Sequence, residues 1–184
     1  MLKKEDYDRL KTRSAAYFEK AHIAITPVEL EKFQVAEYNL GCVDEIGLEL
    51  IEYVNTERCC AKELVLFPGQ TCPEHRHPPV CGGPGKEETF RCRDGLVYLY
   101  VEGEPNCDDT TMKAVPPASR AQYFTCRHEV VLHPGEQFTI YPNTLHWFQA
   151  GPDGCIVSEF STTSRDEYDI YTDPAIDAAQ NRTL

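Results

Sequence analysis

The stretch Gly69-Gln-Thr-Cys-Pro-Glu-His75-Arg-His77 places two histidines two residues apart. Side chains of a β-strand alternate between its faces, so His75 and His77 on one strand point the same way. A carboxylate, Glu88, follows eleven residues after His77, and a third imidazole, His146, lies far downstream. Imidazole and carboxylate groups are common metal ligands. Ligands carried by separated strands predict a metal ion held inside a small β-barrel.

Short segments with strand patterning surround this stretch. They are separated by Pro-Gly, Gly-Gly and Pro-Asn steps, and they cover residues 47–54, 61–67, 96–101, 129–132, 137–141 and 155–161. Many short strands with frequent turns are typical of an all-β sandwich or barrel. The fold class expected here is therefore all-β.

Helical patterning is confined to the N-terminal part of the chain. Residues 3–20 have apolar positions at near-helical spacing, and a short helix is expected from Pro27 to about Phe33. Thr26 and Glu29 have the spacing of a capping box around Pro27. We expect residues 1–33 to be a helical segment packed on the barrel, residues 34–172 to form the barrel with its metal site, and residues 173–184 to form a tail.

Composition excludes several classes of protein. The chain has 184 residues and a formal net charge of -12, which disfavours a nucleic-acid partner because phosphate binding needs a basic surface. No apolar run is long enough to span a membrane, and the N-terminus lacks the apolar core of an export signal, so a cytoplasmic location is expected. The nine cysteines contain no CxxC pair and are expected to be mostly free thiols.

Two segments resemble the motifs of the cupin family. Gly69, His75, His77, Glu88 and Gly95 follow the first motif, with a longer spacer (residues 78–87) before the glutamate. Gly135 and the run Tyr141-Pro-Asn143-Thr-Leu-His146 resemble the second motif, with Asn143 at a usual glycine position. Asparagine tolerates the left-handed backbone conformation that glycine supplies. The resemblance implies a double-stranded β-helix (jelly-roll) barrel in which His75, His77, Glu88 and His146 bind one divalent metal.

The spacer narrows the resemblance to one family. The runs from Cys72 to Pro79, from Gly85 to Arg93 and from Tyr141 to Gln149 look like those of the D-lyxose isomerases. This resemblance implies interconversion of D-lyxose and D-xylulose, weaker action on D-mannose and D-fructose, and a preference for manganese. Because cupins commonly form dimers, a homodimer is also expected.

The residues are compatible with that chemistry. Three histidines and a glutamate leave two positions open on a six-coordinate ion, where a sugar can bind and have its carbonyl polarised. Such a mixed nitrogen and oxygen set favours Mn2+ or Fe2+ and leaves Co2+ and Zn2+ open. An enediol intermediate also needs a group that moves a proton between C2 and C1.

Lys86 and Glu159 are the candidate acid–base residues. Lys86 lies two residues before Glu88, so on a strand it shares the inward face while Glu87 points away. A metal nearby is expected to disfavour the charged lysine, which would favour proton shuttling, although a cationic lysine can also polarise a substrate oxygen. Glu159 interrupts an apolar segment and is expected to be the general base. The resemblance places an acid–base pair at both positions.

Other polar and aromatic residues have weaker claims to the site. Tyr98 and Tyr100 share a strand face and are candidates to offer hydroxyls to a polyol. The acidic run 166–169 is expected to be a solvated face. Two further functions stay open: an iron dioxygenase, which has less need of Lys86 and Glu159, and a sugar-binding protein without catalysis.

Overall fold

The computed structural model describes residues 2–80, 82–177 and 182–183, and part of the predicted tail, with Cys81, lies outside them. Two helices precede the sheet, α1 (Lys4–Lys20) and α2 (Pro27–Glu31). Ten strands follow among the described residues: β1 (Gln34–Ala36), β2 (Leu48–Asn55), β3 (Cys60–Leu66), β4 (Thr71–Arg76), β5 (Glu88–Val101), β6 (His128–Leu132), β7 (Gln137–Ile140), β8 (His146–Ser161), β9 (Ile170–Tyr171) and β10 (Arg182–Thr183). Two 3-10 turns are η1 (Ala121–Tyr123) and η2 (Asp166–Tyr168).

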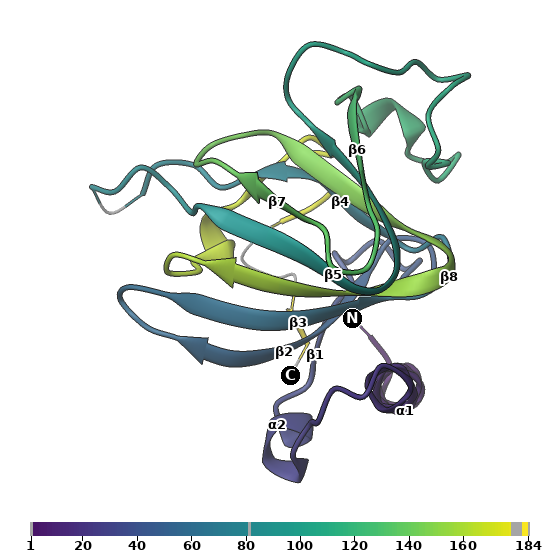
Figure 1. Cartoon of the computed structure of the whole chain (residues 1–184), viewed down its shortest axis with the longest axis vertical. Helices are drawn as coiled ribbons and strands as arrows, with labels where there is room; N and C mark the ends of the chain where they lie inside the picture. The colour runs from purple at the N-terminus through teal and green to yellow at the C-terminus, as the bar shows by residue number, and fades with distance from the viewer. Residues whose placement is uncertain (1, 81, 178–181, 184) are drawn as a thin grey trace.

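The strands form one curled antiparallel sheet in the order β10-β1-β2-β3-β8-β4-β9, with β5 pairing β6, β7 and β8 (Figure 1). The long strand β8 organises this sheet. Its C-terminal half pairs with β3, its N-terminal half pairs with β4, and both halves pair with β5. One strand therefore connects the segment that carries His75 with the segments that carry Glu88 and Lys62.

The predicted capping box is present at the start of α2. The Thr26 side chain accepts a hydrogen bond from the Glu29 backbone N–H, and the Glu29 side chain accepts one from the Thr26 backbone N–H. This satisfies two backbone donors that the first helical turn leaves unpaired. The sequence-based expectation of two N-terminal helices is confirmed, whereas the proposed domain division remains a prediction.

Alternation on the strands separates two apolar layers. Leu48, Leu50 and Leu64 face the barrel interior, while Ile51 and Val65 face outwards against Leu10 and Phe18 of α1. Burial of this outer layer fixes α1 against the sheet, because apolar area removed from water stabilises the contact at roughly 25 cal/mol per Å². Among the described residues, no helix is long and apolar enough to cross a membrane.

A register shift in β5 overturns one of the predictions. Between Cys92 and Asp94 the strand has one extra residue relative to β8, which exchanges its inward and outward faces, whereas Gly95 and Val97 on either side of the second shift stay on one face. Tyr100 therefore lies outside the barrel interior, where its ring stacks on Trp147 and its hydroxyl donates to Glu129 at 2.5 Å. The expectation that Tyr98 and Tyr100 offer hydroxyls to a ligand in the barrel was wrong, because neither residue lines the cavity described below.

Candidate metal centre and its cavity

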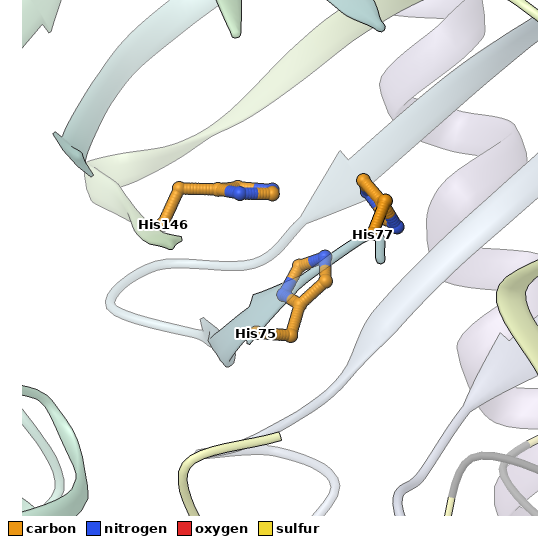
Figure 2. Close-up of side chains that lie close together, drawn as sticks. All are labelled: His75, His77 and His146. Atoms are coloured by element: carbon orange, nitrogen blue, oxygen red, sulfur yellow. The ribbon is translucent and has the colours of Figure 1, made fainter. Parts of the chain in front are cut away.

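Three imidazoles converge inside the barrel. His75 comes from β4, His77 follows the end of that strand, and His146 begins β8, and Figure 2 shows their rings turned towards one another. Ring centroids are 4.3 Å apart for His75 and His146, 4.9 Å for His75 and His77, and 5.4 Å for His77 and His146. All three side chains are buried. The left-handed backbone of Asn143 (φ 60°) precedes His146, at the position where the sequence pattern anticipated it.

Glu88 completes the group from the start of β5. Its Oε1 lies 3.0 Å from His146 Nε2 and 3.3 Å from His77 Nε2. The structure thus brings together the four side chains that the spacing singled out, from three separate strands and the loop after β4.

The hydrogen bonds of the histidines leave the same nitrogen of each ring available. The Nδ1 atom of His75 lies 2.8 Å from the Pro73 carbonyl oxygen, and that of His146 lies 3.0 Å from the Thr144 carbonyl oxygen. The Nδ1 atom of His77 lies 2.5 Å from Asp169 Oδ1. These oxygens accept, so Nδ1 carries the hydrogen and the lone pair lies on Nε2. One ligand nitrogen from each of the three rings lies within 4.8 Å of the others.

A metal ion fits this donor set. His146 Nε2 is buried and, within the described part of the chain, has no hydrogen-bond partner, because this lone pair and Glu88 Oε1, 3.0 Å away, are both acceptors. A buried polar atom without a partner is costly unless something occupies the site. His75, His77 and His146 can therefore hold a metal ion, and Glu88 adds a carboxylate oxygen beside two of them.

The neighbouring charges also favour a divalent cation. Lys62 and Lys86 pair with three carboxylates, those of Glu88, Glu159 and Asp166, and a fourth carboxylate, that of Asp169, lies against His77. Two ammonium groups leave two negative charges uncompensated in this buried cluster. One divalent ion supplies that charge, and an uncompensated buried charge is otherwise strongly unfavourable.

Lys86 forms a close ion pair with both glutamates. Its Nζ lies 2.7 Å from Glu88 Oε2 and 2.8 Å from Glu159 Oε1, and the lysine and Glu159 are both buried. The alternation predicted around Lys86 is present, because Glu87 is exposed between buried neighbours.

Lys86 and Glu159 shift each other's pKa within this ion pair. Burial lowers the pKa of the ammonium, but Glu159 and Glu88 outweigh burial and raise the pKa above its usual value. Burial likewise raises the pKa of the Glu159 carboxyl, and Lys62 and Lys86 outweigh it, so this pKa lies below its usual value. These ion pairs favour a charged Lys86 and an ionised Glu159, and the expected influence of a bound metal on Lys86 stays a prediction.

The acidic run after β8 belongs to the cavity wall. Asp166 and Asp169 line the same cavity as the histidines, and Asp169 accepts the His77 Nδ1 hydrogen. The prediction of a solvated face was wrong at these two positions. Lys62 was not predicted as a cavity residue, because it is a single lysine in an apolar segment. The only sign of its position was that, by the alternation of a strand, it shares a face with Leu64.

The cavity beside the histidines has a volume of about 250 Å³. Ligand pockets of drug-sized molecules range from about 300 to 1,000 Å³, so this space suits a smaller molecule. Charged and apolar groups both line it, the apolar ones being Leu48, Leu50, Leu64, Phe90 and Phe148. The lining therefore offers hydrogen bonds and ion pairs together with apolar contact.

The eight described cysteines are free thiols, as the sequence predicted. Cys72 lines the cavity, and burial raises the pKa of its thiol to about 12. Without a metal, this residue is therefore a neutral thiol near the histidines.

Comparison with solved structures identifies the fold. L-ribose isomerase of Acinetobacter sp. DL28, solved with L-ribose, aligns with a TM-score of 0.80 at 15% identity over 100% of this chain and 97% of that chain. L-ribose isomerase of Cellulomonas parahominis aligns with a TM-score of 0.75 at 18% identity over the same shares. These alignments and the curled antiparallel sheet confirm the cupin-like β-barrel.

Sequence comparison identifies the family. The family model for D-lyxose isomerase matches residues 19–180. The D-lyxose/D-mannose isomerase of Thermosediminibacter oceani is 59% identical over 180 residues, which cover 96% of each chain. The D-lyxose ketol-isomerase of Cohnella laeviribosi is 60% identical over 172 residues, which cover 94% of this chain and 93% of that one. The chain therefore belongs to the D-lyxose isomerase family and is a sugar isomerase.

Proposed function

We propose that this chain is a metal-dependent aldose–ketose isomerase that interconverts D-lyxose and D-xylulose, with weaker action on D-mannose and D-fructose. The observation that carries the proposal is the convergence of three Nε2 atoms and Glu88 beside the Lys86–Glu159 ion pair in one small cavity. The Thermosediminibacter oceani relative is named for both D-lyxose and D-mannose, and this name supports the proposed substrate range.

In this proposal His75, His77, His146 and Glu88 hold one divalent ion, preferably Mn2+. The mixed nitrogen and oxygen donors suit that ion, while Fe2+, Co2+ and Zn2+ are also compatible with it. When bound, the ion acts as a Lewis acid on the sugar carbonyl and makes the C2 proton easier to remove.

Glu159 is the proposed base. Its ionised carboxylate takes the proton from C2 of the aldose, which leaves an enediolate. The hydroxyl proton then passes from O2 to O1, and Glu159 returns its proton to C1 to give the ketose. Burial favours this role, since Glu159 is only 4% exposed and few water molecules compete for the proton.

Lys86 is the proposed partner of that base. Its ammonium group holds Glu159 at 2.8 Å and keeps the carboxylate ionised before the reaction. Once Glu159 has taken the proton, the same ammonium can donate a hydrogen bond to the sugar oxygen on which charge develops. Lys86 thus assists the transfer of the hydroxyl proton between O2 and O1. We also propose that the enzyme is a homodimer.

The test is an assay for D-xylulose formation from D-lyxose on metal-stripped protein, with and without added Mn2+. Ketose is expected only with metal. Glu159→Gln and Lys86→Met are expected to lower kcat by about 10²- to 10⁴-fold while about one metal ion per chain remains bound. Glu57→Gln and Lys20→Met, at exposed positions, are matched controls expected to keep full activity.

Three outcomes would contradict the proposal. Turnover by metal-free protein would exclude the metal from the reaction. Full activity of both cavity variants would remove Lys86 and Glu159 from the mechanism. Absence of ketose from D-lyxose, with oxygen uptake in its place, would favour the dioxygenase alternative.

A further inference from the structure

A second buried lysine faces the cavity from β3. Lys62 is 2% exposed, lines the cavity, and lies directly opposite Glu159 in the β3–β8 ladder. Directly opposite residues on neighbouring strands have side chains close enough to interact. Lys62 Nζ lies 3.8 Å from Glu159 Oε1.

The ammonium group of Lys62 binds the segment that follows β8. Nζ donates to Ser164 Oγ at 2.8 Å and to Asp166 Oδ2 at 2.9 Å, and Ser164 Oγ donates in turn to Asp166 Oδ1. Asn55 binds the Ser164 backbone on both sides, at 3.0 Å to its carbonyl oxygen and 3.1 Å to its N–H. The ends of β2 and β3 therefore hold the segment that places Asp166 and Asp169 in the cavity.

Asp166 also lies within reach of the catalytic pair. Its Oδ1 is 3.7 Å from Lys86 Nζ, whereas Glu159 is 2.8 Å from that nitrogen. Lys62 draws Asp166 to the closer distance of 2.9 Å. The two ammonium groups thus pair with three carboxylates. Lys62 is closest to Asp166, whereas Lys86 is closest to Glu159 and Glu88.

Burial of this ammonium group is costly for folding. A buried ion pair often contributes no more stability than apolar residues of the same volume, while loss of one partner leaves an uncompensated charge. Apolar residues, among them Leu64 on the same strand, surround this part of the cavity. A lysine here is therefore better explained by the arrangement of the neighbouring carboxylates than by stability.

We propose that Lys62 is a positioning residue of the isomerisation, which keeps Asp166 away from Lys86 and so preserves the Lys86–Glu159 pair. This inference rests on the proposed function. Without Lys62, the Asp166 carboxylate loses the ammonium group 2.9 Å away and competes with Glu159 for Lys86, whose Nζ lies 3.7 Å from Asp166 Oδ1. Lys62 acts through Asp166 and Glu159 and does not contact the reacting carbons.

A double-mutant cycle tests this role. Lys62→Met is expected to lower kcat by about 10- to 100-fold, with KM changed by less than about five-fold and metal content unchanged. Asp166→Asn in the Lys62→Met background removes the competing charge, so the double variant is expected to recover kcat at least about five-fold over Lys62→Met alone. Lys20→Met, an exposed lysine, is the control for loss of a positive charge.

Each outcome has a distinct meaning. An unchanged kcat in Lys62→Met, or strictly additive effects in the cycle, overturns the positioning role. A raised KM with unchanged kcat overturns it in favour of substrate binding by Lys62. If Lys62→Met does not fold, Lys62→Gln supplies the same cycle. Wild-type protein assayed in parallel separates the two claims, because its inactivity would overturn the proposed function itself.

Discussion

Asp169→Asn is expected to weaken metal binding without removing any metal ligand. Asp169 Oδ1 accepts the His77 Nδ1 hydrogen at 2.5 Å, and both side chains are at most 7% exposed. This bond fixes the ring so that Nε2 faces the other histidines. The asparagine keeps an acceptor of the same size but loses the charge.

The magnitude follows from the type of bond. A hydrogen bond to a charged group contributes about 1.5–3 kcal/mol, against about 0.5–1.5 kcal/mol for a neutral one. The difference of about 1–2 kcal/mol corresponds to roughly a 5- to 30-fold weaker affinity for the ion. Loss of partners that orient histidine ligands in other metal sites costs about 10- to 100-fold.

The assay is a competition titration of Mn2+ between the protein and a fluorescent chelator at fixed pH. Asp153→Asn, at an exposed position, is the control and is expected to bind Mn2+ like the wild type. Saturating Mn2+ should restore most of the turnover of Asp169→Asn. An affinity within two-fold of the wild type would refute the orienting role, and complete loss of binding would make Asp169 itself a ligand.

Three further substitutions test the scaffold. Burial raises the pKa of the Glu49 carboxyl from 4.5 to about 8. The contribution of Glu49 to stability is therefore greatest below about pH 4.5 and falls as the pH rises to about 8, by up to about 1.4 kcal/mol per pH unit. Glu49→Gln should remove this pH dependence of the free energy of unfolding, which is measured by urea denaturation at pH 5 and pH 9. The same pH dependence in the variant and the wild type would contradict a buried, protonated Glu49. Gly85→Ala should destabilise the protein by more than about 1 kcal/mol and weaken Mn2+ binding. At φ 100° the added Cβ would lie 2.4 Å from the His77 carbonyl oxygen. An unchanged melting temperature with Mn2+ present would show that the loop adapts. Thr26→Ala should cost about 1 kcal/mol in calorimetry and leave kcat unchanged, whereas a catalytic defect would link α2 to the site.

Residues whose position depends on local periodicity were predictable from the sequence. His75 and His77 lie two apart around a strand end, and Lys86 and Glu88 show the same spacing before and at the start of β5. In each pair, alternation alone is sufficient to place both side chains on one face.

Residues placed by long-range pairing were not predictable in the same way. Lys62 faces the cavity because β3 pairs with β8, far along the chain, and no local pattern specifies that register. Asp166 and Asp169 lie in an irregular segment that has no period. Tyr100 was misassigned because the bulge between Cys92 and Asp94 exchanges the inward and outward faces of β5, and bulges change the twist and register of a strand without a strong sequence signal.

The separation of the paired segments also bears on how the protein is made. In sequence, 102 residues separate Lys62 from Ser164, and 92 separate His77 from Asp169. A ribosome that adds about 5–20 residues per second therefore exposes Lys62 and His77 for several seconds before Ser164 and Asp169 emerge. During that interval β3 and β4 lack β8, and their open edges are prone to pair with other chains. We therefore expect newly made protein to depend on chaperones until β8 and the Ser164–Asp169 segment have emerged, and to acquire its full affinity for metal only then.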